Sequence, residues 1–374
     1  MAGFRDEAET DAAARPAAGE ANAFAALMDQ GRKHLQAGAW QDAAETFAVA
    51  LALRPEDEVA LEHVGLALMS AGRFAEADAY NARLRAIQAR QLPRRLADGL
   101  AAIWQRTGTI EREYLEPAAV QWAWELADQS AWNKNAWLKA AAWGHEARLL
   151  MRRWWEAATV KQLDEIDDLI ELLSLNEYRS ALVERGGCIL VGGHVGPTAA
   201  AVKMFHGGNW MFRPFGAAGF GRAHGTALMV VPNSIVTMRT LVKQVRDGVT
   251  IGLMADSPMA RDRLEVEFLG RDVELPLQIP KLIQRYGTAS FWCCPLWHNK
   301  RIRIELKRLP DPLADEPRDA WSRRWFAAYL ENLETVMRGR PENLGLFSGI
   351  WSNVNPEVLR TRQQQAARIH RFAN

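Results

Sequence analysis

The sequence predicts an α/β protein in which an all-α repeat region precedes a domain built on a mixed sheet. Two observations support this prediction. Residues 24–90 repeat a pattern at a spacing of 34, and from residue 187 onward short apolar runs alternate with stretches of helical period. Such alternation is typical of a sheet that is covered by helices.

Composition indicates an ordinary globular protein with room for more than one domain. The 374 residues are 48% hydrophobic and 24% charged, with a formal net charge of +1. That charge argues against a dedicated nucleic-acid-binding protein, which would have a strong basic excess. No stretch approaches the roughly 18–20 uninterrupted apolar residues of a membrane span, and the acidic start does not resemble a signal peptide.

The three cysteines favour a reducing compartment. They lie inside apolar runs and lack metal-ligand spacing. We therefore expect a cytoplasmic protein. Peripheral contact with the inner face of the cytoplasmic membrane stays open, because tryptophans crowd residues 122–155 and the C-terminal tail is basic.

The 34-residue spacing resembles the tetratricopeptide repeat, whose small residues let two antiparallel helices pack closely. Two units are few for a free-standing solenoid, so we expect the following helices to cover the open end. A groove for a protein partner and a helical hairpin pair without a ligand remain equally open. The matched positions are Gly31 with Gly65, Gly38 with Gly72, Trp40 with Phe74, and Ala43 with Ala77.

The pattern divides the chain into five parts. Between the repeats and the α/β domain the sequence is helical throughout, and Leu163, Ile166, Ile170 and Leu173 follow a helical spacing. The predicted parts are a disordered leader (1–22), the repeats (23–92), a helical linking region (93–180), the α/β domain (181–355) and a basic tail (356–374).

Two polar residues follow predicted strands directly. His194 comes after the apolar run that starts at Cys188 and before a helix that starts near Thr198, while Asp256 ends the run "VTIGLMAD". Active sites of α/β sheets gather at the carboxyl ends of strands. We therefore expect both side chains at one edge of the sheet.

Three stretches in a fixed order indicate a family. They are "GGCILVGGHVGPTAAAVKMF", "RTLVKQVRDGVTIGLMADSP" and "LEVEFLGRDVELPLQIPKLIQRYGTASFWCCPLW", and "YLENLETVMRGRPENLGLF" follows them. Over residues 180–355 this order resembles the lysophospholipid acyltransferase-like superfamily, in particular the late acyltransferases of lipid A biosynthesis.

The resemblance implies an acyltransferase. Such an enzyme moves a fatty or aminoacyl group from a carrier-protein or coenzyme A thioester to a hydroxyl or amine of a lipid, saccharide or peptide. His194 would remove the acceptor's proton as general base. No cofactor is implied, because the thioester already supplies the driving force.

One departure from the family leaves the chemistry open. Its histidine pairs with an acid five residues later, and here that position is Ala199. In one interpretation His194 acts without a partner. In a second, a carboxylate from elsewhere in the chain replaces the acid, and Asp256 is the best candidate for that carboxylate. In the third reading the domain is an inactive scaffold that recruits partners through its repeats.

Further residues suit substrate binding. Arg213 matches an arginine of the family, Arg222 follows shortly, and a guanidinium suits phosphate; a structural salt bridge is equally open for Arg213. The N–H groups around Gly193 and Gly196 would stabilise an oxyanion, because a helix begins there. We expect no metal, since the remaining histidines of this domain, His206, His224 and His298, lack partner spacing.

Overall fold

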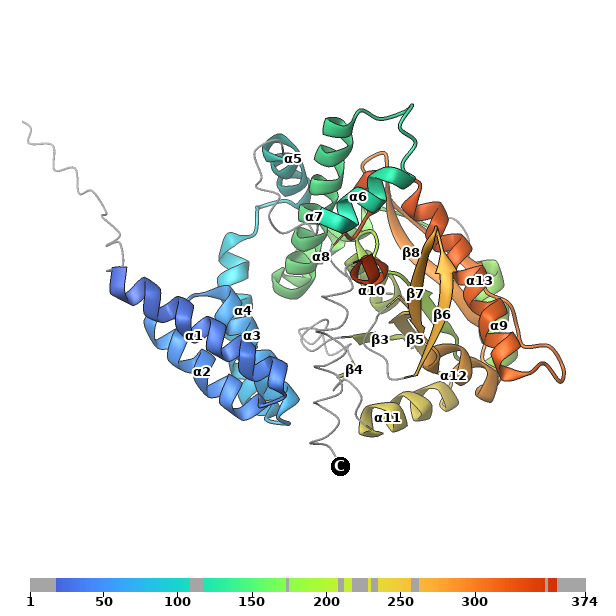
Figure 1. Cartoon of the computed structure of the whole chain (residues 1–374), viewed down its shortest axis with the longest axis horizontal. Coiled ribbons are helices and arrows are strands. Elements are labelled where there is room, and N and C mark those ends of the chain that lie inside the picture. The colour runs from blue at the N-terminus through green and yellow to red at the C-terminus, as the bar shows by residue number, and fades with distance from the viewer. Residues whose placement is uncertain are drawn as a thin grey trace, which may run out of the picture. The chain divides into compact units, whose positions relative to one another are not determined.

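The structure is a computed structural model that describes residues 18–107, 117–172, 175–207, 212–216, 228–229, 235–256, 262–346 and 349–354. The chain divides into two compact units, Met1–Tyr80 and Asn81–Asn374 (Figure 1). The first is helical within the described residues, and the second contains a mixed sheet. The predicted order of a helical region followed by an α/β domain is confirmed.

The first unit repeats one turn geometry. Its helices are α1 (Ala18–Ala37), α2 (Trp40–Leu53), α3 (Glu58–Ser70) and the start of α4 (Phe74–Gln91). Gly38 follows α1 with φ 74° and Gly72 follows α3 with φ 78°. Their N–H groups donate to Leu35 and Met69 respectively, again 34 residues apart. The spacing seen in the sequence is thus the distance along the chain between two equivalent turns.

Two domain boundaries need correction. The leader was predicted to extend to residue 22, but α1 begins at Ala18, because this Ala-rich segment favours a helix. Residues 170–172 were predicted to be helical but form the strand β1 (Ile170–Leu172). There, pairing with β9 (Arg301–Arg308) makes β1 the edge strand of the sheet and prevails over the helical spacing; the N–H of Ile302 donates to Leu169 O at 2.8 Å. Residues 1–17 and the predicted tail lie outside the described residues.

The second unit is built on a seven-stranded sheet of order β1-β9-β8-β2-β5-β3-β4. Strands β2, β3, β4, β5 and β8 are parallel, whereas β1 and β9 run the opposite way. The strands are β2 (Ile189–Gly192), β3 (Phe212–Gly216), β4 (Leu228–Met229), β5 (Thr250–Met254), β8 (Ser290–His298) and β9 (Arg301–Arg308). A separate antiparallel hairpin consists of β6 (Arg263–Phe268) and β7 (Arg271–Pro276).

Helices surround this sheet. Those before β2 are α5 (Leu96–Arg106), α6 (Pro117–Leu126), α7 (Lys134–Ala157), α8 (Val160–Asp167) and α9 (Asn176–Arg185). Those after it are α10 (Thr198–Gly207), α11 (Ile235–Arg246), α12 (Gln278–Tyr286) and α13 (Arg318–Met337), followed by the short 3-10 helices η2 (Pro341–Asn343) and η3 (Gly349–Val354).

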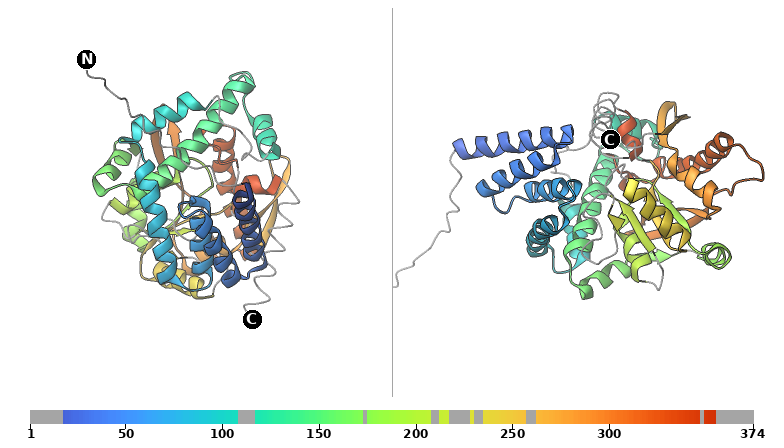
Figure 2. Two further views of the ribbon diagram at one scale, coloured as in Figure 1. Left: turned by 90° about the vertical axis from the view of Figure 1, so that its left-hand side faces the viewer. Right: turned by 90° about the horizontal axis from the view of Figure 1, so that it is seen from below.

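Alternate strand residues supply two separate cores. Ile189 and Val191 pack into a core with residues of α6 and α13, whereas Leu190 packs into a second core with residues of α7 and α10. Adjacent Cys293 and Cys294 divide between the two cores in the same way. Figure 2 shows α7 and α13 on opposite sides of the sheet. Both faces of the sheet are therefore buried, as the apolar strand sequences require.

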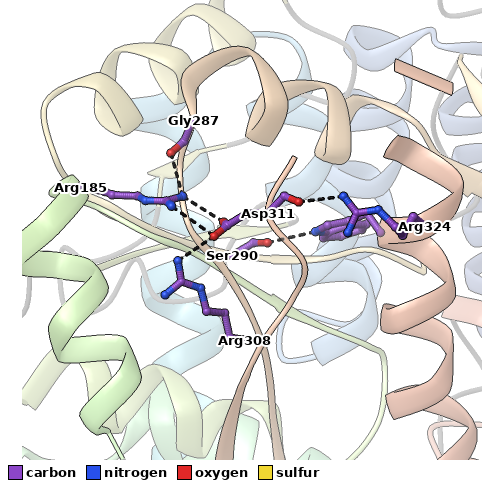
Figure 3. Close-up of polar contacts among 7 residues, drawn as sticks. Arg185, Gly287, Ser290, Arg308, Asp311 and Arg324 are labelled. Carbon is purple, nitrogen blue, oxygen red and sulfur yellow. Dashed lines mark hydrogen bonds and ion pairs between the residues drawn. The ribbon is translucent and has the colours of Figure 1, made fainter. Parts of the chain in front are cut away.

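The amino end of β8 is held by a cluster of arginines around one carboxylate (Figure 3). Arg185 of α9 makes two hydrogen bonds to Asp311, at 2.9 and 3.2 Å, and Arg308 donates to the same carboxylate at 2.8 Å. Arg324 of α13 donates to the Asp311 carbonyl. This cluster ties two helices to the sheet at the edge opposite the carboxyl end of β2, leaving that other end for the site described below.

Most of the crowded tryptophans belong to the core. Trp122, Trp137, Trp154 and Trp155 are almost fully buried. Among the described residues, no helix is both long and apolar enough to cross a membrane.

Gly144 tests the packing of α7. A Cβ at this position would overlap the backbone carbonyl of Glu342 in η2. We expect Gly144→Ala to lower the free energy of unfolding by about 1–3 kcal/mol, because backbone must move to make room. Urea unfolding followed by tryptophan fluorescence would measure this, since every tryptophan except Trp40 lies in the second unit.

Gly19→Ala is the control, because a Cβ there meets nothing within 4 Å. Gly19 lies in the first unit, whose sequence contains only one tryptophan, so unfolding of this variant is followed by circular dichroism. It adds the same methyl group to a helix without the overlap, so we expect no loss of stability. Equal stability of Gly144→Ala and wild type would contradict the close approach of α7 and η2.

Candidate functional site

His194 and Asp256 lie at the carboxyl ends of neighbouring strands. β2 and β5 pair in parallel as far as Gly192 and Met254, and the N–H of Ala255 donates to Gly192 O at 3.0 Å. Because the two strands end level with each other, the residues just beyond them face the same edge. The structure thus brings together the two residues that the strand-end argument singled out.

The Asp256 carboxylate contacts His194 at two points. Its Oδ1 lies 2.6 Å from Nδ1 of the imidazole, and its Oδ2 accepts the His194 backbone N–H at 2.8 Å. The Asp256 side chain is 1% exposed, whereas that of His194 is 31% exposed. One oxygen therefore orients the ring while the other fixes the backbone that bears it.

The environment of Asp256 favours its ionised form. Burial alone would raise the pKa of this carboxyl group. The hydrogen bonds from His194 and the Ile350 N–H, together with the charge that the His194 ring carries when it is protonated, outweigh burial and lower the pKa below its usual value. A carboxylate only accepts hydrogen bonds, so Nδ1 of the neutral ring bears the proton. Nε2 then has a free lone pair, and it has no hydrogen-bond partner among the residues that the structure describes.

A late segment of the chain lies against the loop that bears His194. Asn343 O accepts the Gly196 N–H at 2.8 Å. Gly345 approaches so closely that a Cβ there would overlap His194 O. Farther along, the Ile350 N–H reaches Asp256 Oδ2 at 3.3 Å. The site therefore depends on residues about 150 positions after the histidine.

The expected oxyanion-binding amides are already engaged. The Gly193 N–H points to Cys294 Sγ at 3.3 Å, and the Gly196 N–H donates to Asn343 O. Both glycines are buried. The prediction that these N–H groups would be open to an oxyanion was wrong, because strand-end packing and the late segment use them. Their small size matters instead: a Cβ at Gly196 would overlap Pro295 O.

The predicted arginines fall largely outside what is described. Arg213 lies on β3, two strands from β2, but its side chain is outside the described residues, as is the whole of Arg222. Ala199, at the position of the family's acid, is buried in the core that contains Leu190. The acid that contacts His194 comes instead from the end of the neighbouring strand β5.

Arg148 of α7 is a charged residue near the site that the sequence did not indicate. A Cβ added at Gly345 would lie 3.1 Å from Arg148 Nη1 and would overlap His194 O, so the guanidinium lies near the backbone of the histidine. Burial and nearby Arg152 lower the pKa of Arg148 to about 10, while the charge of Asp256 raises it. No local motif marks this arginine, since only the packing of α7 against η2 brings it close.

Other reactive groups near the pair are unsuited to chemistry. Cys294 and Tyr329 are buried, and burial raises the pKa of each well above its usual value. The Tyr329 hydroxyl donates to Gly192 O at 3.1 Å, which fixes the end of β2. No group of three or more metal-ligating side chains occurs in the described parts of the chain. The imidazole of His194 is therefore the best candidate for a reactive group here.

His145, one turn before Arg148, gives a pH-dependent prediction. Burial and the charge of Arg148 lower its pKa from 6.5 to about 4. As pH falls below 6.5, His145 binds a proton in the unfolded chain but not in the folded chain. The free energy of unfolding therefore decreases until about pH 4, where the folded chain binds the proton as well. We expect wild type to lose about 3 kcal/mol more than His145→Gln over this range.

Urea unfolding of both proteins at several pH values would measure the difference. His298, which is partly exposed in the same unit, gives the control variant His298→Gln. Parallel stability curves for wild type and His145→Gln would show that His145 is not buried in its neutral form.

Comparison with known proteins shows a distant similarity to a polysaccharide export protein. No protein-family model matches the chain. The chain is 24% identical over 298 residues to the Vi polysaccharide export protein VexE of Salmonella typhi, a similarity that covers 78% of this chain and 45% of that protein. The chain thus spans less than half the length of this curated relative.

Proposed function

We propose that the second unit is an acyltransferase in which His194 is the general base and Asp256 orients it. The observation that supports this most strongly is the 2.6 Å contact between Nδ1 and the carboxylate. It supplies the partner that the family's motif lacks in this sequence. The order of motifs over residues 180–355 supports the reaction class.

The proposed reaction begins at the exposed side of the ring. Nε2 of His194 accepts the proton of an acceptor hydroxyl or amine, whose oxygen or nitrogen attacks the thioester carbonyl carbon. The tetrahedral intermediate then collapses, the carbon–sulfur bond breaks, and the thiolate takes the proton from the imidazolium. Asp256 stabilises the charged ring throughout but does not itself take the proton.

The acceptor that we propose is a saccharide. Hydroxyl and amine acceptors on lipids, saccharides and peptides all fit the chemistry above. The relative's name refers to export of a polysaccharide, which favours the saccharide among them. The first unit, with its tetratricopeptide-like turns, would bind a protein partner and bring it to the enzyme.

Arg148 is our candidate for binding an anionic group of the donor. Carrier-protein and coenzyme A thioesters both contain phosphate, which a guanidinium binds with two parallel hydrogen bonds. The position of Arg148 beside the backbone of His194 supports this assignment, whereas the side chains of Arg213 and Arg222 lie outside the described residues.

The central test compares wild type with His194→Ala and Asp256→Asn. Each protein would be incubated with carrier-protein and coenzyme A thioesters and oligosaccharide acceptors, and acylated products would be measured by mass spectrometry. We expect product formation to fall at least a thousandfold in His194→Ala and roughly a hundredfold or more in Asp256→Asn. The control is His298→Ala, which removes a histidine at the end of β8 whose ring forms a hydrogen bond with Asn299.

A scaffold is the second candidate function. Two observations favour it: Ala199 replaces the family's acid, and the relative is named as an export protein. A scaffold would bind partners equally well with and without the His194 imidazole. The scaffold would be favoured over the enzyme if wild type formed no acylated product from any thioester and if partner binding were unchanged in His194→Ala and Asp256→Asn.

Arg148→Met tests the assignment of the donor site. We expect the KM for the thioester donor to rise roughly tenfold or more, because a charged hydrogen bond is lost, with a smaller change in kcat. Arg153→Met is the control, since Arg153 is exposed on the same helix. An unchanged KM would remove Arg148 from the donor site and leave the roles of His194 and Asp256 untouched.

A further inference from the structure

The carboxylate of Asp256 is held by a second segment besides the loop of His194. The Ile350 N–H donates to Oδ2, the same oxygen that accepts the His194 backbone N–H. Gly349 precedes it with φ 65°, a left-handed conformation that glycine adopts without strain. The start of η3 thus lies directly against the buried side of the pair.

Gly349 leaves no room for a larger residue. A Cβ at this position would overlap Asp256 Oδ2 and would lie 2.8 Å from His194 Cβ. The left-handed backbone and the missing side chain are therefore both needed at one position. Only this combination lets the N–H of Ile350 approach an oxygen that is already bonded to His194.

A tryptophan contact anchors the segment. Trp351 is 1% exposed, and its ring meets that of Trp122 in α6 edge to face, with ring centroids 5.3 Å apart. Arg271 of the β6–β7 hairpin lies over the other ring, 5.0 Å from the Trp122 centroid. Because α6 and the hairpin fix Trp351, they also fix the two residues immediately before it.

We propose that Gly349 and Ile350 are positioning residues for the catalytic pair, which act by holding Asp256 in its two-point contact with His194. This inference rests on the proposed function for its effect on turnover. The contact itself does not depend on it. Both oxygens of Asp256 are then occupied: Oδ1 orients the ring, and Oδ2 joins the backbones of two segments that are far apart in the sequence.

The test is Gly349→Ala, read first by a signal that needs no activity. The His194 backbone N–H donates to Asp256 Oδ2, so its proton resonance in histidine-labelled protein reports on that oxygen. We expect it to shift upfield in Gly349→Ala, because the new methyl group displaces the carboxylate. The matched control is Gly287→Ala, where φ is 61° and a Cβ meets nothing within 4 Å, so backbone strain is similar without the overlap.

A second readout separates positioning from folding. If the proposed reaction occurs, kcat should fall roughly ten- to a hundredfold in Gly349→Ala, with the donor KM unchanged. Trp351→Phe should shift the His194 resonance and lower kcat in the same directions as Gly349→Ala, but by smaller amounts. It replaces Gly349→Ala as the test if that variant does not fold. A His194 resonance that stays in place in the folded variant, or that moves equally in Gly287→Ala, would overturn the inference. A shifted resonance without turnover of any donor by wild type would contradict only the proposed function.

Discussion

The geometry of the site depends on a single buried carboxylate with two acceptor oxygens. Asp256 lies just beyond β5 and binds both the ring and the backbone of His194, while a third bond comes from Ile350. Burial of a charge is costly unless hydrogen bonds compensate for it. Here the compensating hydrogen bonds come from the His194 ring, the His194 backbone and the Ile350 backbone. The same hydrogen bonds therefore stabilise the buried charge and orient the imidazole.

Close backbone approach is the second constraint, and it follows from the first. Three segments must converge on Asp256 and the loop after β2, and side chains at their contact points would keep them apart. Gly196 lies against Pro295, Gly345 against His194, and Gly349 against Asp256. Cores on both faces of the sheet bring these segments together, and the arginine cluster around Asp311 secures the opposite edge of the sheet.

The sequence predicted what depends on local pattern and strand order. Strand-end placement of His194 and Asp256, the 34-residue spacing and the alternation of strands with helices could all be read directly. Arg148 and Gly349 could not, because their positions follow from packing between segments that are distant in the sequence. The strand at 170–172 was missed since its few residues fit a helical spacing as well, and only pairing with β9 distinguishes the two. Engagement of the Gly193 and Gly196 amides was also invisible in the pattern.

The tautomer of His194 tests the central claim most directly. Long-range nitrogen–proton correlation in protein labelled at histidine distinguishes the two ring nitrogens of each imidazole. The account predicts that the neutral His194 ring bears its proton on Nδ1, and that Asp256→Asn removes this preference. A proton on Nε2 in wild type, or a tautomer that is unchanged in Asp256→Asn, would contradict the role of Asp256 as the residue that orients the base.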